Sequence, residues 1–239
     1  MSEAKAGSPY GYPWAEWLAR ALADGLSLEG AGEALSVGGS TLFLRSQTGN
    51  PMDVHLNTGA NTRRYLSRQP ELSLRTKLRA LLIWNTGPEV LMAQRMLAPD
   101  VQPEAERVAA LPWRAQDALL DEIEGLIASL PVGERLPKAN LASWRSTDEV
   151  KHAAALAQQY ANAGYEAEPL FTRLGKIACR DNFTEMHALK HHQATYEEFH
   201  ATRASLRWRH AVAAVQAAAI SHGRIQDVYE HAADVMQFA

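Results

Sequence analysis

Residues 181–210 read DNFTEMHALKHHQATYEEFHATRASLRWRH, and this stretch carries the strongest pattern in the chain. It contains five of the nine histidines, whereas the first 151 residues contain only His55. At the helical spacing of about 100° per residue, its side chains separate onto distinct faces. The pattern predicts one helix over 182–202 and a second helix over 205–221.

The predicted helix over 182–202 has three faces of different character. One is polar and is expected to face solvent: Lys190, Gln193, Glu197 and His200. A second is apolar and is expected to face the core, although ionisable groups share it: Leu189, Tyr196 and Phe199, with Glu185, His192 and Arg203. The third carries imidazole, hydroxyl and carboxylate groups: Thr184, His187, His191, Thr195 and Glu198. Buried polar groups must find partners or shift their pKa, so the sequence predicts a polar cluster near the interior.

The third face suggests a metal site. His187 and His191 stand four residues apart, so their rings lie one above the other on the helix, and Glu198 follows on the same arc. Such a set can hold iron or another divalent transition metal, with the neighbouring threonines orienting the ligands. The HExxH motif is not present, because Ala188 occupies the position of its glutamate. The alternative is that both histidines bond to backbone or carboxylate groups between helices.

A second metal pattern overlaps the first. Glu149 and His152 form an ExxH motif, and Glu197 and His200 form another, as in the di-iron sites of four-helix bundles. Two features argue against this interpretation. Ser146 and Glu149 have the spacing of a capping box, and Glu197 and His200 fall on the face expected to meet solvent.

Alanine directly follows five of the histidines, and residues 210–220 are dense in alanine. Small side chains let helices approach closely, or they leave a cavity between them. In a cavity, imidazoles at the edge would supply acid–base groups near neutral pH. The predicted catalytic residues are His192, Tyr196 and Glu185.

The remainder of the chain is expected to be helical, apart from one hairpin. The runs Thr41–Ser46 and Met52–Leu56 flank a Gly-Asn turn inside a region rich in Gly, Ser, Thr and Asn, which predicts two β-strands. Further helices are predicted over 13–24, 61–68, 72–85, 88–98, 103–111, 114–129, 147–163, 168–179 and 224–237. The predicted fold is therefore all-α, with antiparallel helical hairpins or a bundle and a minor N-terminal β-hairpin. Its expected parts are 1–60, 61–130 and 140–239, forming one continuous domain, with the best internal boundary at 131–141.

Composition narrows the class of protein. The 239 residues are 46% hydrophobic and 21% charged, as in ordinary globular proteins. A net charge of −3 gives no reason to expect a nucleic-acid partner. The single Cys179 excludes an internal disulfide and fits a reducing compartment. No signal peptide and no apolar run of membrane-spanning length is evident, so a cytoplasmic location without a membrane partner is expected.

Together these features predict a small intracellular enzyme with a pocket lined by His and Glu between its C-terminal helices, acting on a small molecule. A bound iron would suit oxidase or oxygenase chemistry, and acid–base chemistry without a cofactor is the other option. A homodimer is compatible with either. The rival hypothesis is a non-catalytic helical interaction or scaffold protein whose histidines are structural.

Overall fold

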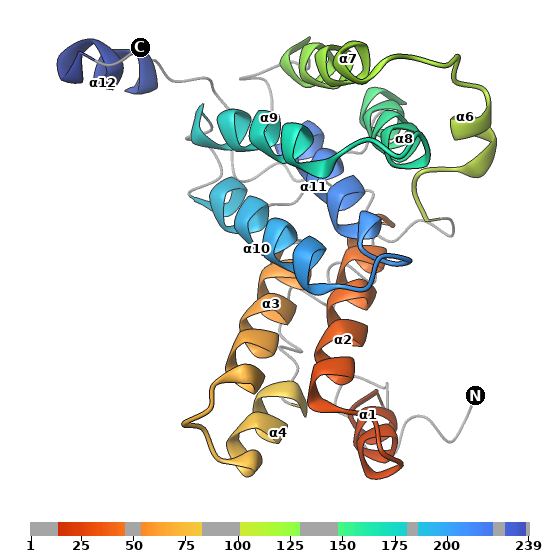
Figure 1. Cartoon of the computed structure of the whole chain (residues 1–239), viewed down its shortest axis with the longest axis vertical. Helices are drawn as coiled ribbons and strands as arrows, with labels where there is room; N and C mark the ends of the chain where they lie inside the picture. Colours follow the sequence, from red (N-terminus) through yellow and green to blue (C-terminus); the bar gives the residue numbers. More distant parts are fainter. Residues whose placement is uncertain are drawn as a thin grey trace, which may run out of the picture.

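The computed structural model describes residues 14–45, 54–82, 101–129, 148–180, 186–221 and 228–237. Within these ranges the chain forms eleven helices and no strand, which confirms the all-α prediction (Figure 1). The helices are α1 (Trp14–Ala23), α2 (Leu28–Phe43), α3 (His55–Arg68), α4 (Leu74–Leu82), α6 (Ala105–Ala109), α7 (Gln116–Ser129), α8 (Asp148–Asn162), α9 (Ala167–Arg180), α10 (His187–Ala201), α11 (Trp208–Ser221) and α12 (Val228–Met236). The helix predicted over 88–98 and the boundary at 131–141 lie outside the described residues.

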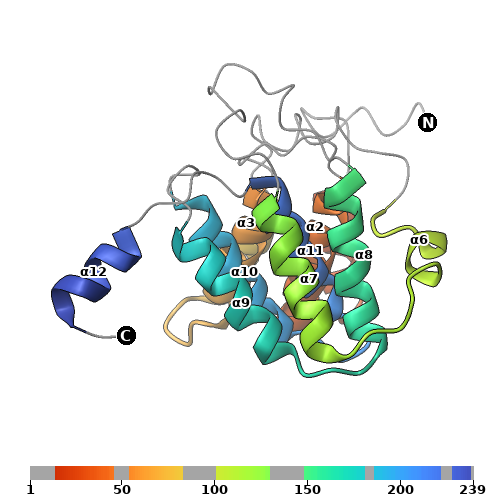
Figure 2. The same ribbon diagram turned by 90° about the horizontal axis from the view of Figure 1, so that it is seen from above.

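Helix α11 is the centre of the structure. It contacts α2, α7, α8, α9 and α10, and Figure 2 shows it between these helices. Every residue from His210 to Ala217 is buried. A helix that is buried on all sides must be apolar or small all round, and the alanines of α11 meet that condition while letting its neighbours approach. The alanine-rich sequence therefore lets the neighbouring helices pack closely along most of α11, and Ala214, Ala217 and Ala218 also line a cavity.

Helices α2 and α3 form a tight antiparallel pair. A Cβ atom added at Gly39 of α2 would lie 2.6 Å from the carbonyl oxygen of Leu56 of α3. One added at Gly32 would lie 2.8 Å from Cγ of Arg64, farther along the pair. Ser27 caps the start of α2, where its hydroxyl accepts a hydrogen bond from the Gly30 amide at 2.9 Å.

The predicted β-hairpin is wrong where the structure describes it. Residues 41–43 belong to the last turn of α2, and residues 55–56 belong to the first turn of α3. Residues 46–53 lie outside the described part of the chain. The prediction failed because glycines weigh against a helix in isolation, whereas here Gly32 and Gly39 are required by the close approach of α3.

The apolar core runs from α11 outward to α7, α8 and α9. It is made by aliphatic and aromatic side chains on facing sides of these helices: Leu119, Ile123 and Ile127 of α7; Val150, Leu156 and Tyr160 of α8; Leu170, Phe171 and Leu174 of α9. Helices α2 and α10 pack on another side of α11, and α3 packs against both of them. The candidate site lies on this second side, where α10 meets α3, α9 and α11.

Candidate functional site

Helix α10 buries the third of its predicted faces, the one that carries imidazole, hydroxyl and carboxylate groups. His191, Thr195 and Glu198, all on the third predicted face, are at most 2% exposed. The prediction of a polar cluster in the interior is thus confirmed. Leu189 and Tyr196, predicted to lie in the core, are 39% and 36% exposed, because the helix turns its polar arc inward.

Glu198 is part of a buried ion pair with Arg64 of α3. The Arg64 side chain is 1% exposed, and its NH1 donates to Glu198 Oε2 at 2.5 Å. Arg64 also donates to Glu29 of α2 and to the carbonyl oxygen of Ala201. Asn61 Nδ2 donates to the other oxygen of Glu198 at 3.2 Å. Paired and hydrogen-bonded in this way, Glu198 joins α10 to α3 and is a structural carboxylate.

His210 lies in a second buried polar chain next to this ion pair. Its Nδ1 is 2.8 Å from Ser40 Oγ, and its Nε2 is 3.1 Å from Thr202 Oγ1. Asn57 Nδ2 donates to the same Ser40 oxygen at 2.7 Å. Burial, reinforced by the nearby Arg64 cation, lowers the pKa of His210 to about 4. The ring is neutral near pH 7, both its nitrogens have partners, and its role is structural.

A small cavity opens between α9, α10 and α11, with Val54 at the start of α3 on its edge. Apolar side chains form most of its wall: Val54, Leu174, Ile177, Ala178, Ala188, Ala214, Ala217 and Ala218. The three remaining lining residues are His187, His191 and His192 of α10. The volume of the cavity is about 30 Å³, which is room for about two water molecules. The empty volume is about 430 Å³ when the part open to solvent is included.

His191 and His192 each bury a ring nitrogen that has no hydrogen-bond partner among the described residues. For His191 it is Nε2, and for His192 it is Nδ1. Burial lowers the pKa of His191 to about 3, helped by the neighbouring His192 and His210 rings. Burial also lowers the pKa of His192. Both imidazoles are therefore neutral near pH 7, and each keeps an unused donor or acceptor beside the cavity.

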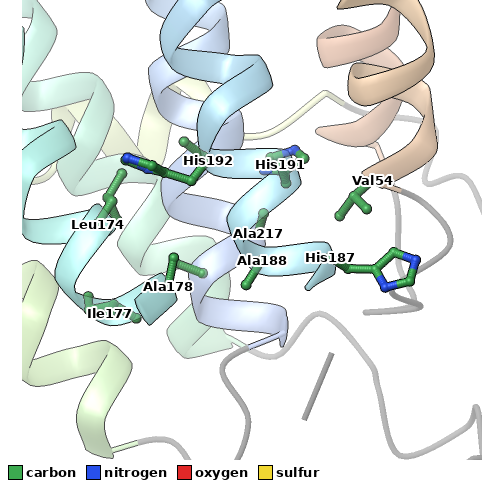
Figure 3. A pocket seen from close by; sticks show the side chains of 11 residues that line it. Val54, Leu174, Ile177, Ala178, His187, Ala188, His191, His192 and Ala217 are labelled. Carbon is green, nitrogen blue, oxygen red and sulfur yellow. The ribbon is translucent and has the colours of Figure 1, made fainter. Parts of the chain in front are cut away.

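The position of each ring follows from its neighbours. The His192 ring lies against α9, where a Cβ atom at Gly175 would be only 3.2 Å from His192 Nε2. The ring of His191 lies 5.1 Å from that of Phe43, centre to centre. Figure 3 shows His192 and His187 pointing in opposite directions from α10. His187 approaches His55 of α3, with ring centres 5.2 Å apart.

The predicted metal ligands are not drawn together by this arrangement. His187 faces His55, His191 is buried between helices, and Glu198 pairs with Arg64. Among the described residues, no three His, Cys, Asp or Glu side chains form a group that could hold a metal ion. Iron at His187, His191 and Glu198 therefore stays a prediction without support from the geometry.

The structure does not bring the predicted catalytic residues together either. His192 lines the cavity, whereas Tyr196 is on the surface and donates to Glu168 Oε1 at 3.1 Å. This hydrogen bond to a carboxylate raises the pKa of Tyr196. Glu185 lies outside the described residues. The two ExxH histidines face different carboxylates: His152 lies 3.5 Å from Glu122, and His200 lies 3.1 Å from Glu168.

The sequence did not reveal several residues that shape this region. Arg64, Ser40 and Asn57 stood apart from the histidine stretch and carried no motif. Ser40 in particular lay in the region predicted to be loop and hairpin. Nothing local marks Arg64 as buried, because its burial depends on the tertiary approach of α10.

Comparison of the chain with protein-family models, with curated proteins and with solved structures finds no match to any of them. None of the helices in the described ranges is long and apolar enough to cross a membrane. Evidence about function therefore comes from the geometry of the site alone.

Proposed function

We propose that the protein binds a small, uncharged, largely apolar molecule in the cavity between α9, α10 and α11 and acts on it by acid–base chemistry. The observation that supports this proposal is that two residues with unpartnered ring nitrogens, His191 (Nε2) and His192 (Nδ1), both line one cavity. Apolar walls with a few placed polar groups are the usual composition of a small-molecule site. An ionic ligand would find no described charged side chain in this wall.

The two histidines would have different roles. His192 is half-buried and neutral, so its imidazole can accept a proton from the bound molecule and return it, as a general base and acid do. His191 has a pKa of about 3 and stays neutral, which suits it to orient the ligand by a hydrogen bond. This is the cofactor-free option, in which the two imidazoles alone move the proton and orient the ligand.

Filling the cavity tests whether it is the binding site. Small neutral compounds would be screened against the parent protein by nuclear magnetic resonance of the histidine rings, where binders should shift the His191 and His192 signals. Ala188→Leu places three more carbon atoms against the cavity and should weaken these binders at least about tenfold. Ala128→Leu, on the exposed face of α7, is the matched control and should bind as the parent does. Binders that ignore Ala188→Leu would refute the proposal, as would a cavity that takes up only water.

Moving one ring tests the role of His192. Gly175→Ala introduces a methyl group 3.2 Å from His192 Nε2, so the ring must shift while α9 keeps its helix. Gly125→Ala is a matched control, since a Cβ atom there meets nothing within 4 Å. We expect bound compounds to dissociate more readily from Gly175→Ala than from Gly125→Ala. Equal affinities in the two variants would remove His192 from the site.

A second candidate function, a non-catalytic interaction or scaffold protein, is favoured by one surface. Trp17 of α1 and Leu74 of α4 are 60% and 63% exposed on helices that touch each other. Exposed large apolar side chains are candidates for protein contacts. Sedimentation of the parent and of a Trp17→Ser, Leu74→Ser variant distinguishes the two functions. Self-association lost in the variant would support the scaffold function, and a monomeric parent would count against a homodimer through this surface.

A further inference from the structure

A pair of histidines lies between the start of α3 and the start of α10. His55 is the first residue of α3 and His187 is the first residue of α10, and both are half-buried. Their ring centres are 5.2 Å apart with an angle of 47° between the ring planes. In Figure 3 the His187 ring extends away from His192, on the side of the cavity where Val54, the neighbour of His55, is labelled.

The separation of the rings can be compared with that in a tetrahedral site. A ring nitrogen binds zinc at about 2.0–2.1 Å, which places the centre of the ring about 3.2 Å from the ion. Two such rings at a tetrahedral angle of about 109° have centres about 5.2 Å apart. The observed separation of the ring centres is therefore compatible with one ion between the two rings.

We propose that His55 and His187 form a two-histidine site for a divalent transition-metal ion that prefers imidazole ligands, such as zinc, copper or nickel. Among the described residues no third His, Cys, Asp or Glu side chain completes the group, and the remaining positions would be filled by water or by groups outside the described part of the chain. The ion would hold the start of α3 to the start of α10. Because His187 also lines the cavity, the ion would lie at the edge of the cavity. This site is separate from the proposed His191–His192 function and does not depend on it.

Zinc chloride titrated into the untagged full-length protein near pH 7.5 tests the site by calorimetry. We expect one zinc ion per chain and binding that is weakened at least about tenfold by His55→Ala and by His187→Ala, since each removes one of two protein ligands. His152→Ala and His200→Ala are the matched controls, because each also removes one half-buried or exposed histidine, and they should bind zinc as the parent does. Circular dichroism would confirm that all four variants keep their helices.

A measurement on the parent alone keeps the test independent of how the variants fold. In spectra of the histidine rings, the first additions of zinc should shift the signals of His55 and His187 before those of the other seven histidines. Three results would overturn the proposal: no zinc binding, binding that survives loss of either histidine, or first shifts at other rings. The pair would then be an aromatic contact only, which the same ring separation also allows.

Discussion

Lowering the pH from about 7.5 to about 5.5 should destabilise the fold by about 3 kcal/mol through His191 and His210 alone. Both rings are buried and neutral, with pKa values near 3 and 4 in the folded protein. The His192 and His210 rings act electrostatically on His191, and Arg64 and Glu33 act electrostatically on His210. Of these charges, Arg64 lowers the pKa of His210 and Glu33 raises it.

The magnitude follows from proton binding by the unfolded chain. A histidine in the unfolded state has a pKa of about 6.5, so below that pH it takes up a proton that the folded state excludes. Stability is therefore complete above about pH 7 and falls as the pH is lowered toward the folded-state pKa. Over this interval each buried histidine contributes a loss of about 1.4 kcal/mol. His192, whose pKa burial also lowers, adds a loss of the same sign.

Urea unfolding at about pH 7.5, 6.5 and 5.5 measures the effect, with dilute protein because the sequence pI is about 6.3. His191→Phe and His210→Gln should each reduce the pH-dependent loss by about 1.4 kcal/mol, whatever they do to stability at the higher pH. Ile123→Val, which trims the apolar core, is the control and should lower stability equally at every pH. A parent whose stability changes by less than about 1 kcal/mol would show that these rings take up protons in the folded state.

Two further predictions concern the packing of α3. In urea unfolding, Gly39→Ala should destabilise the protein by about 1–3 kcal/mol, because its methyl group would meet a backbone carbonyl of α3. Gly38→Ala is the control: its Cβ has open space around it, so this variant should be neutral or stabilised by up to about 1 kcal/mol. Arg64→Met should cost about 3–5 kcal/mol, since it leaves Glu198 buried without its cation. Adding Glu198→Gln to Arg64→Met should recover part of that loss in the same assay, because the buried group is then neutral. If the double variant is no more stable than Arg64→Met, the loss does not come from breaking the ion pair.

The helical periodicity of residues 182–202 predicted which α10 residues share a face, and the burial of His191, Thr195 and Glu198 confirms that the polar arc turns inward. Periodicity is a local property, so it could be obtained from the sequence. The partner of each group could not. Glu198 needs Arg64, which is 134 residues away, and nothing in the local sequence indicates that approach.

Helix α2 was not predicted, because the reason for its glycines lies in a contact with another helix. Its glycines favour turns when they are considered one at a time. They are helical here because α3 lies so close that Gly39 has no room for a side chain. The cavity was expected as one of two options, because small side chains either let helices approach closely or leave a space. The sequence could not decide between them, since the alanines in the wall come from three helices and only their assembly leaves a space.

The central position of α11 has a consequence for how this chain is made. Ser40 and His210, hydrogen-bonded in the folded protein, are 170 residues apart, and α2, α7, α8, α9 and α10 all rest on α11. During synthesis these helices leave the ribosome before the element that they cover. Their apolar faces must stay exposed, or be shielded by chaperones, until residue 221 has emerged, because contacts between distant segments cannot form earlier. A ribosome-stalled chain ending before Trp208 should accordingly be far more sensitive to protease than one that ends beyond α11.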